Sequence, residues 1–200
     1  MTDELQTTES DPASIADADE IIAATRTWLE RAVIGLNLCP FAKSVHVNQR
    51  IRFCVSGARY TDELLRDLSL ELRVLQAADA DVCETTLLIH PGVLTEFIEF
   101  SHFLRAAEAA VTKLELAGEF QIASFHPDYQ FGDAGPDDIE NYTNRSPYPT
   151  LHLLRESSIT RAVAAFPDAA MIYERNIDTL RRLGHAGWQR LWISADAVVS

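Results

Sequence analysis

The amino-acid sequence predicts one α/β domain, a sandwich in which helices pack on a sheet of roughly four strands. Segments with a helical spacing of apolar residues alternate along the chain with short, strand-like apolar segments. Strands joined through helices of this length favour parallel pairing, so we expect a mostly parallel or mixed sheet. A ferredoxin-like α+β arrangement is the alternative, and it differs in the order and direction of the strands.

The first half of the domain is predicted to contain two helices and two strands. Helical spacing of apolar residues runs from about Asp19 to Leu36, ahead of Pro40. The segment "RIRFCVS" alternates apolar and polar residues, which is typical of a strand. A leucine-rich helix then runs from an N-cap at Thr61 to about Ala78. The apolar segment "ETTLLIHPG" is predicted to be a buried strand that ends at its Pro-Gly pair.

The second half adds two strands and three helices. A helix capped by Thr95 is expected to stop at Gly118, and "FQIASF" follows as the third strand. The segment "TLHLL" is the fourth strand. A short helix from Ser157 to Ala165 and a last helix, capped by Asp168 and ending at Gly184, complete the domain.

The connection between the third and fourth strands is unusually long. It spends roughly twenty residues on Pro, Gly, Asn, Asp and Tyr, and loops of that length are usually functional or disordered. Ligands of open α/β sheets bind beyond the carboxyl ends of the strands, where this loop begins. We therefore expect the loop to form a lid or a wall of a pocket.

Composition and charge limit the classes of partner. Residues 1–17 are acidic and poor in apolar side chains, so we expect them to be a disordered tail ahead of a single domain over residues 18–200. The net charge of −13 argues against a nucleic-acid partner, because phosphates require a basic surface. No apolar run is long enough to span a membrane, and the acidic start is unlike a signal peptide. Three cysteines without a C-x-x-C pair suit a reducing cytoplasm.

Two histidines are the leading catalytic candidates. His90 and His126 each end a predicted strand, and each is followed by proline. In parallel strands the two imidazoles would share one edge, where either could act as general acid or base. Together with His152 on the fourth strand they could hold a divalent metal such as zinc or iron. The alternative is that these side chains are hydrogen-bonded strand ends with no chemical role.

The long loop supplies the candidates for ligand binding. Arg145 offers a planar fork suited to a carboxylate or phosphate, and Asn144, Asn141 and Tyr129 could add hydrogen bonds. An intraloop salt bridge of Arg145, with the two asparagines capping turns, is the alternative.

Cys39 is a third catalytic candidate, as a nucleophile. It follows a predicted helix C-terminus, whose dipole disfavours a thiolate. A small buried side chain before a turn is the competing interpretation.

These residues lead to two functional hypotheses. One is a cytoplasmic enzyme acting on a small anionic metabolite, with His126 as acid or base and Arg145 holding the anion. The other is a binding or regulatory module without catalysis, which would hold a small-molecule ligand in the same pocket or a partner on the surface around Trp188 and Trp192. Glycine-rich nucleotide motifs and a G-x-S-x-G elbow are absent from the sequence. The oligomeric state is left open.

Three blocks of the sequence, "GLNLCPFAK", "SFHPDYQF" and "NRSPYPTLHLLRE", carry a resemblance to a known family. The chain resembles a bacterial family catalogued as domain of unknown function 1415, from about Thr25 to Leu183. The resemblance implies a bacterial cytosolic protein of this size, and it implies no reaction, cofactor or catalytic residue.

Overall fold

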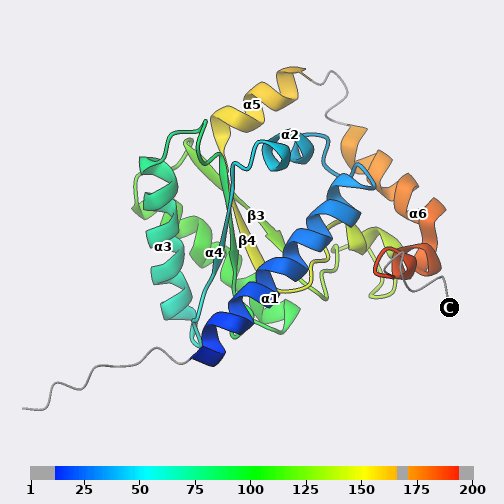
Figure 1. Cartoon of the computed structure of the whole chain (residues 1–200), viewed down its shortest axis with the longest axis horizontal. Helices are drawn as coiled ribbons and strands as arrows, with labels where there is room; N and C mark the ends of the chain where they lie inside the picture. The colour runs from blue at the N-terminus through cyan, green and yellow to red at the C-terminus, as the bar shows by residue number, and fades with distance from the viewer. Residues whose placement is uncertain (1–11, 166–170, 194–200) are drawn as a thin grey trace, which may run out of the picture.

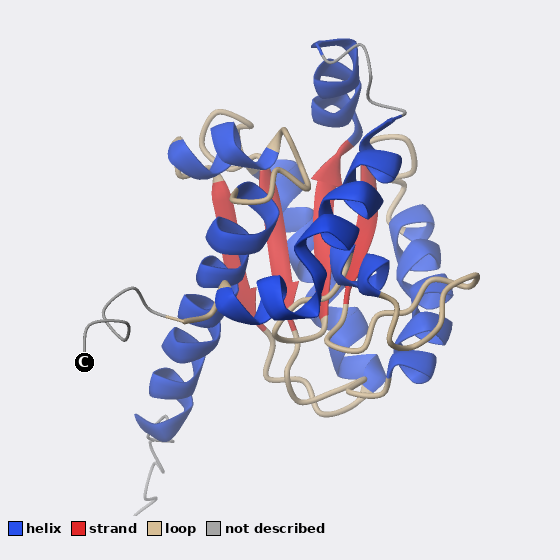
Figure 2. Cartoon of the chain, turned by 90° about the vertical axis from the view of Figure 1, so that its right-hand side faces the viewer, coloured by secondary structure: helices blue, strands red, loops and turns tan. Residues whose placement is uncertain are grey.

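The structure is a computed structural model that describes residues 12–165 and 171–193. The chain folds as a sheet with helices on both faces (Figures 1 and 2). In chain order the elements are α1 (Pro12–Trp28), the π-helical η1 (Leu29–Ile34), α2 (Ala42–Val47), β1 (Ile51–Val55), α3 (Thr61–Ala77), β2 (Thr85–Ile89), α4 (Phe97–Lys113), β3 (Phe120–Phe125), the 3-10 helix η2 (Ile139–Thr143), β4 (Thr150–Arg155), α5 (Glu156–Ala165) and α6 (Ile172–Arg190).

The sheet has four strands in the order β1-β2-β4-β3. The β1–β2 pair is parallel, whereas β4 pairs antiparallel with both β2 and β3. β3 therefore runs in the same direction as β1 and β2. This confirms the predicted α/β sandwich with a mixed four-stranded sheet, and helices on both faces distinguish it from a ferredoxin-like arrangement.

The long loop explains why β4 is the reversed strand. The loop starts where β3 ends and returns to the same edge of the sheet without a crossover helix. The next strand must then run in the opposite direction, and it fits between β2 and β3.

Each face of the sheet covers its own apolar core. On one face the leucines of α3, at positions 64, 68, 72 and 75, pack with α4 and with Leu151 and Leu153 of β4. On the other face Trp28, Leu29 and Leu180 pack over the opposite side of the sheet. Side chains alternate along a strand, so His152, between two leucines of the first core, points toward the second.

Two predicted boundaries at the ends of the chain differ from the structure. α1 begins at Pro12, ahead of the expected start near Asp19, so residues 12–17 are helical rather than part of a disordered tail. Proline suits the first position of a helix, and the alanines after it are strong helix formers. The rest of the predicted tail lies outside the described residues, as does the predicted cap Asp168.

The predicted N-caps of the two middle helices each differ from the structure by one residue. Thr61 is the first residue of α3, whose N-cap is Tyr60, and α4 follows an N-cap at Glu96 rather than Thr95. The Glu63 carboxylate accepts hydrogen bonds from the backbone N–H groups of Arg59 and Tyr60. The start of α3 is therefore stabilised by a carboxylate three residues after the N-cap, and not by the threonine hydroxyl that the sequence predicted.

The last helix continues past its predicted end. Gly184 has a φ of 62°, which bends α6 rather than stopping it, and the helix resumes to Arg190. This extension carries Trp188 to the molecule's second core. Within the described parts of the chain, helices are too short or too polar to cross a bilayer.

Candidate functional site

His90 and His126 follow β2 and β3 directly, at the edge of the sheet where β4 begins. Since β2 and β3 run in the same direction, the two imidazoles emerge at one edge, and both pack against Phe100. Both side chains are fully buried, with 0% of their surface exposed. The topology therefore brings the two histidines together and also removes them from solvent.

The hydrogen bonds of His126 identify its charge state. Its Nδ1 accepts the backbone N–H of Asp128 (3.0 Å) and so carries no proton, and its Nε2–H donates to the carbonyl oxygen of Leu94 (3.2 Å). Burial lowers the pKa of this imidazole. His126 is thus a neutral side chain whose two nitrogens are already engaged.

His90 is neutral for a related reason. Its Nδ1–H donates to the carbonyl oxygen of Val93 (3.0 Å), and its Nε2 is buried with no hydrogen-bond partner in the described part of the chain. Burial, and then the neighbouring His126, lower the pKa of His90 to about 4. The two histidines fix consecutive carbonyl groups of the turn before α4, where Leu94 has a left-handed φ of 56°.

The predicted three-histidine metal site is not formed. His152 lies in the middle of β4, not at the edge, and its Nε2–H donates to Thr85 Oγ1 (2.7 Å), whose own hydroxyl donates to the carbonyl of Leu153. Burial lowers the pKa of His152 to about 4. No group of three His, Cys, Asp or Glu side chains among the described residues is placed to hold a metal ion.

A cavity does lie under the long loop, and we call it the loop pocket. It has a volume of about 520 Å³, a size typical of small-molecule sites. The loop, α1 and the end of α6 form its walls through Ala24, Thr27, Trp28, Pro127, Tyr142, Arg145, Ser146, Pro147, Trp188 and Trp192. The expectation that the loop walls a pocket is therefore met at this place, beside the buried histidines rather than over them.

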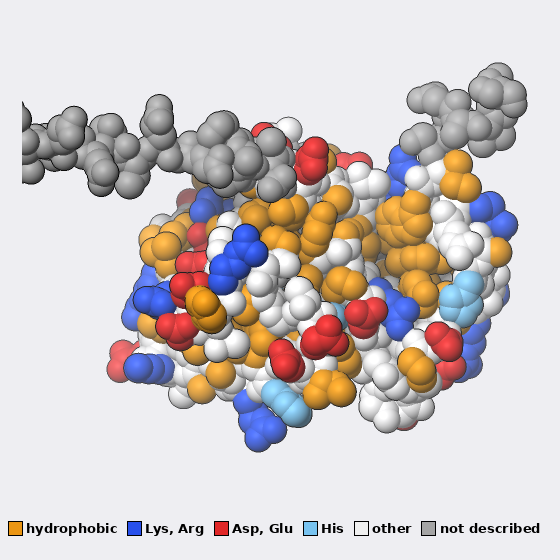
Figure 3. Space-filling model, turned by 90° about the horizontal axis from the view of Figure 1, so that it is seen from below, with side chains coloured by type: hydrophobic (Ala, Val, Ile, Leu, Met, Phe, Trp, Pro, Cys, Tyr) orange, Lys and Arg blue, Asp and Glu red, His pale blue; other side chains and the backbone are white. Residues whose placement is uncertain are grey.

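The face of the molecule that carries these loops also exposes apolar surface. Figure 3 views the molecule from below and shows hydrophobic side chains gathered in a broad area, with charged side chains of both signs beside it. Within the loop pocket, the Trp188 ring stands edge-on to Tyr142 at 4.9 Å and to Trp192 at 5.4 Å between centroids. Edge-on aromatic pairs of this kind make rigid walls.

Arg145 is the cationic side chain of the loop pocket. Its Nε donates to the carbonyl of Tyr129 (3.2 Å) and its Nη2 to that of Pro136 (2.7 Å), while the guanidinium stacks on Tyr142 at 4.4 Å. The alternative of an intraloop salt bridge is not what is observed, because these partners are carbonyl oxygens and no described carboxylate pairs with Arg145. Of the five N–H donors of a guanidinium, three have no hydrogen-bond acceptor among the described residues.

The other residues predicted to bind a ligand instead build the loop. Asn141 is fully buried, accepts the N–H of Phe131 and donates to the carbonyl of Gly135. Asn144 donates to the carbonyl of Ser124 (3.1 Å), and the Tyr129 ring packs on Phe97. None of the three lines the loop pocket. Their polar groups hold the loop in one shape, which leaves Arg145 as the predicted binding residue that faces the pocket.

Cys39 does not have the features of a nucleophile. The side chain packs at the margin of the second core, and burial raises the pKa of its thiol. A raised pKa leaves the thiol protonated, whereas nucleophilic attack requires the thiolate. Cys39 does not line the loop pocket.

The tryptophans contribute more to the loop pocket than the sequence predicted. The protein contains three, Trp28, Trp188 and Trp192, and all of them line the loop pocket. The signal available in the sequence was the spacing of Trp188 and Trp192, four residues apart, which in a helix would put both on one side. In the structure α6 ends at Arg190, and Trp192 lies just beyond it. Trp28 also donates its indole N–H to the carbonyl of Arg145 (2.8 Å) and so ties the loop to α1.

The chemistry of the lining suits binding more than proton transfer. The described lining residues include no His, Cys, Asp or Glu side chain. The hydroxyl of Ser146 donates to the carbonyl of Tyr148 (2.6 Å), and that of Thr27 donates within α1. What remains is one guanidinium among aromatic rings.

Comparison with known proteins gives one match. A family model described as "Protein of unknown function (DUF1415)" matches residues 20–190. No curated protein and no solved structure gives a significant match to the chain.

Proposed function

Because the chain belongs to the DUF1415 family, whose description states no reaction, we propose a function from the geometry: the protein binds a small organic anion in the loop pocket. Arg145 would hold the anionic group, and Trp188, Trp192 and Tyr142 would contact a flat or apolar body. One observation carries the proposal, namely that Arg145 faces an aromatic cavity with no carboxylate paired to it among the described residues.

The negative net charge of the protein makes a cation in the loop pocket significant for anion binding. A chain with a net charge of −13 repels anions in general, so an anion gains affinity only where a cation faces a sheltered space. The guanidinium is held by two carbonyl groups and one ring before any ligand arrives, so little side-chain entropy is lost on binding. This arrangement supports the binding hypothesis more directly than the enzymatic one.

An acid–base role of His126, and an enzyme built on it, stays a prediction. The neutral, enclosed imidazoles lend it less support than the open loop pocket lends to binding. A cytoplasmic location is part of the proposal, and the free thiols of Cys39, Cys54 and Cys83 support it.

Two probes of the same shape test the proposal by calorimetry. Naphthalene-2-sulfonate carries an anionic group, and naphthalene-2-methanol does not. We expect the sulfonate to bind at least about tenfold more tightly, since a charged hydrogen bond contributes about 1.5–3 kcal/mol. The Arg145→Gln substitution should abolish this preference for the sulfonate. The Trp192→Ala substitution should weaken the binding of both probes equally, because it removes aromatic contact area.

The matched control is Arg182→Gln, which removes an exposed arginine of α6 that does not line the loop pocket. It should bind both probes as the parent does. Equal affinity of the parent for the two probes, or a preference that survives in a folded Arg145→Gln protein, would contradict the proposal.

A further inference from the structure

A second cavity, of about 570 Å³, lies between α1, α2 and the edge strand β1. Its lining consists of Arg26, His46, Val47, Gln49, Ile51 and Phe53, and none of these residues lines the loop pocket. Successive helical residues are about 100° apart, so Arg26 projects about 160° away from Ala24 and Trp28 around the axis of α1, and about 100° away from Thr27. We call this second space the edge cavity, and α1 separates it from the loop pocket.

Arg26 provides a cation on one side of the edge cavity. Its guanidinium carbon lies over the Phe53 ring, 4.2 Å from the ring centroid. No described carboxylate pairs with Arg26, whereas Arg52 and Arg50 each have one at hydrogen-bond distance. The planar fork of Arg26 is therefore available for an oxyanion.

His46 faces Arg26 from α2. Its Nε2 lies 3.1 Å from Glu30 Oε1, so Glu30 accepts the Nε2–H bond and sets the orientation of the ring. Nδ1 has no hydrogen-bond partner among the described residues. With its proton on Nε2, His46 presents the lone pair of Nδ1, which can accept a hydrogen bond from a hydroxyl group.

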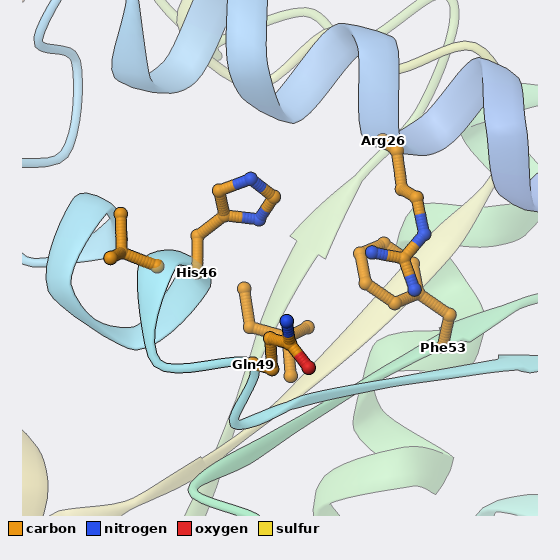
Figure 4. Close-up of a pocket in the computed structure, with 6 residues that line it drawn as sticks. Arg26, His46, Gln49 and Phe53 are labelled. Carbon is orange, nitrogen blue, oxygen red and sulfur yellow. The ribbon is translucent and has the colours of Figure 1, made fainter.

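Figure 4 shows how these groups surround the edge cavity. The His46 ring and the Arg26 guanidinium lie on opposite sides, and the Gln49 amide lies below and between them. The backbone of Gln49 has a left-handed φ of 56°, which is uncommon for a residue other than glycine. The remaining lining is apolar: Val47, Ile51 and Phe53.

From this arrangement we propose that the edge cavity binds a phosphate group, either free or as a monoester. The Arg26 fork and the Gln49 amide supply donors from two directions, and the Nδ1 lone pair of His46 can accept the hydrogen of a P–OH group. This set suits a tetrahedral oxyanion that carries a hydroxyl better than a flat carboxylate, which carries none. The apolar part of the lining would contact the organic part of an ester. The inference concerns a different site from the loop pocket and does not depend on the function proposed there.

Nuclear magnetic resonance of the His46 Cε1–H signal tests this inference on the full chain at pH 7. The signal is assigned by its loss in His46→Gln. Titration with inorganic phosphate, phenyl phosphate and acetate, against potassium chloride at equal ionic strength, should give a saturable shift with both phosphates, with dissociation constants roughly in the millimolar range or below. Phenyl phosphate should bind more tightly than inorganic phosphate, and acetate more weakly than either.

Arg26→Gln should weaken phosphate binding at least about tenfold, and Arg26→Lys should recover part of it because a charge without the fork remains. Arg26 is exposed, so both variants are expected to fold. A phosphate shift no larger than that with chloride, an unchanged affinity in Arg26→Gln, or acetate equal to phosphate would overturn the assignment. Naphthalene-2-sulfonate binding should be unchanged in Arg26→Gln, and phosphate binding unchanged in Arg145→Gln, so each site can fail without the other.

Discussion

At the scale of single residues, hydrogen bonds decide between chemical and structural histidines. A general acid or base needs a nitrogen that reaches the substrate. Both nitrogens of His126 have backbone partners, and His90 uses its one proton on the carbonyl of Val93. These hydrogen bonds favour the alternative interpretation of the sequence, in which both histidines are hydrogen-bonded residues at strand ends.

The His126→Ala substitution separates the two interpretations. We expect the free energy of unfolding to fall by about 2–4 kcal/mol, because the change removes two hydrogen bonds and the ring packed on Phe100. Urea denaturation measures this, with His102→Ala on the exposed face of α4 as the control. An unchanged urea midpoint together with lost ligand binding would restore the catalytic interpretation.

At the scale of elements, Arg155 connects β4 to the end of α3. Its Nη2 donates to the carbonyl oxygens of Leu75 (2.6 Å), Ala78 (2.8 Å) and Cys83 (3.2 Å). The last carbonyls of a helix have no partner inside the helix and carry partial negative charge, so a guanidinium stabilises them. This contact secures α3 at the sheet end opposite to the histidines.

We predict that Arg155→Met lowers the free energy of unfolding by about 1–3 kcal/mol, because it removes these charged hydrogen bonds while keeping an apolar stem. Amide hydrogen exchange should quicken most in the last turn of α3. Arg161→Met, which alters an exposed arginine of α5, should change stability little. Equal effects of the two substitutions would show that the Arg155 contacts contribute nothing measurable.

The irregular helix η1 is the other element with consequences for the sites. Arg26, Thr27 and Trp28 stand in the last α-helical turn, and the π-helical segment begins at Leu29. A π-helix adds residues per turn and so shifts the side chains that follow around the axis. Glu30 then points toward His46 while Trp28 holds the loop, and one helix serves both cavities.

At the scale of the whole molecule, burial of neutral histidines links stability to pH. His90 and His152 have pKa values of about 4 in the folded protein, against about 6.5 for an unfolded chain. Between these values the unfolded chain binds protons that the folded one does not. Their stabilising contribution is therefore complete above pH 6.5 and declines as pH falls toward 4.

The prediction is tested by the pH dependence of stability in His152→Gln. A glutamine can still donate to Thr85 but does not titrate, so the variant should lose about 1 kcal/mol less per pH unit than the parent between pH 6 and 4.5. Urea denaturation across this range measures the difference between the two proteins. Parallel curves would mean that His152 titrates normally in the folded state.

Much of the architecture could be predicted from local pattern. Strands β1 to β4 lie where alternation and apolar runs placed them, because a half-buried sheet requires those patterns from the chain itself. Arg145 could be singled out as a cation in a long loop, and the loop as the wall of a pocket, since composition and length are local properties.

Tertiary structure decided the rest, because burial and partner choice depend on residues distant in the chain. The register of β4 placed His152 opposite Leu87 in the middle of the sheet, and the carbonyl groups of the turn before α4 each accept an N–H from one of the two edge histidines. Trp28 lines the same pocket as Trp188 and Trp192 because α1 and α6 pack on one face of the sheet. Arg26 contacts Phe53 because α1 packs beside β1. A side chain's chemistry is written in the sequence, but its access to solvent and to partners is set by the fold.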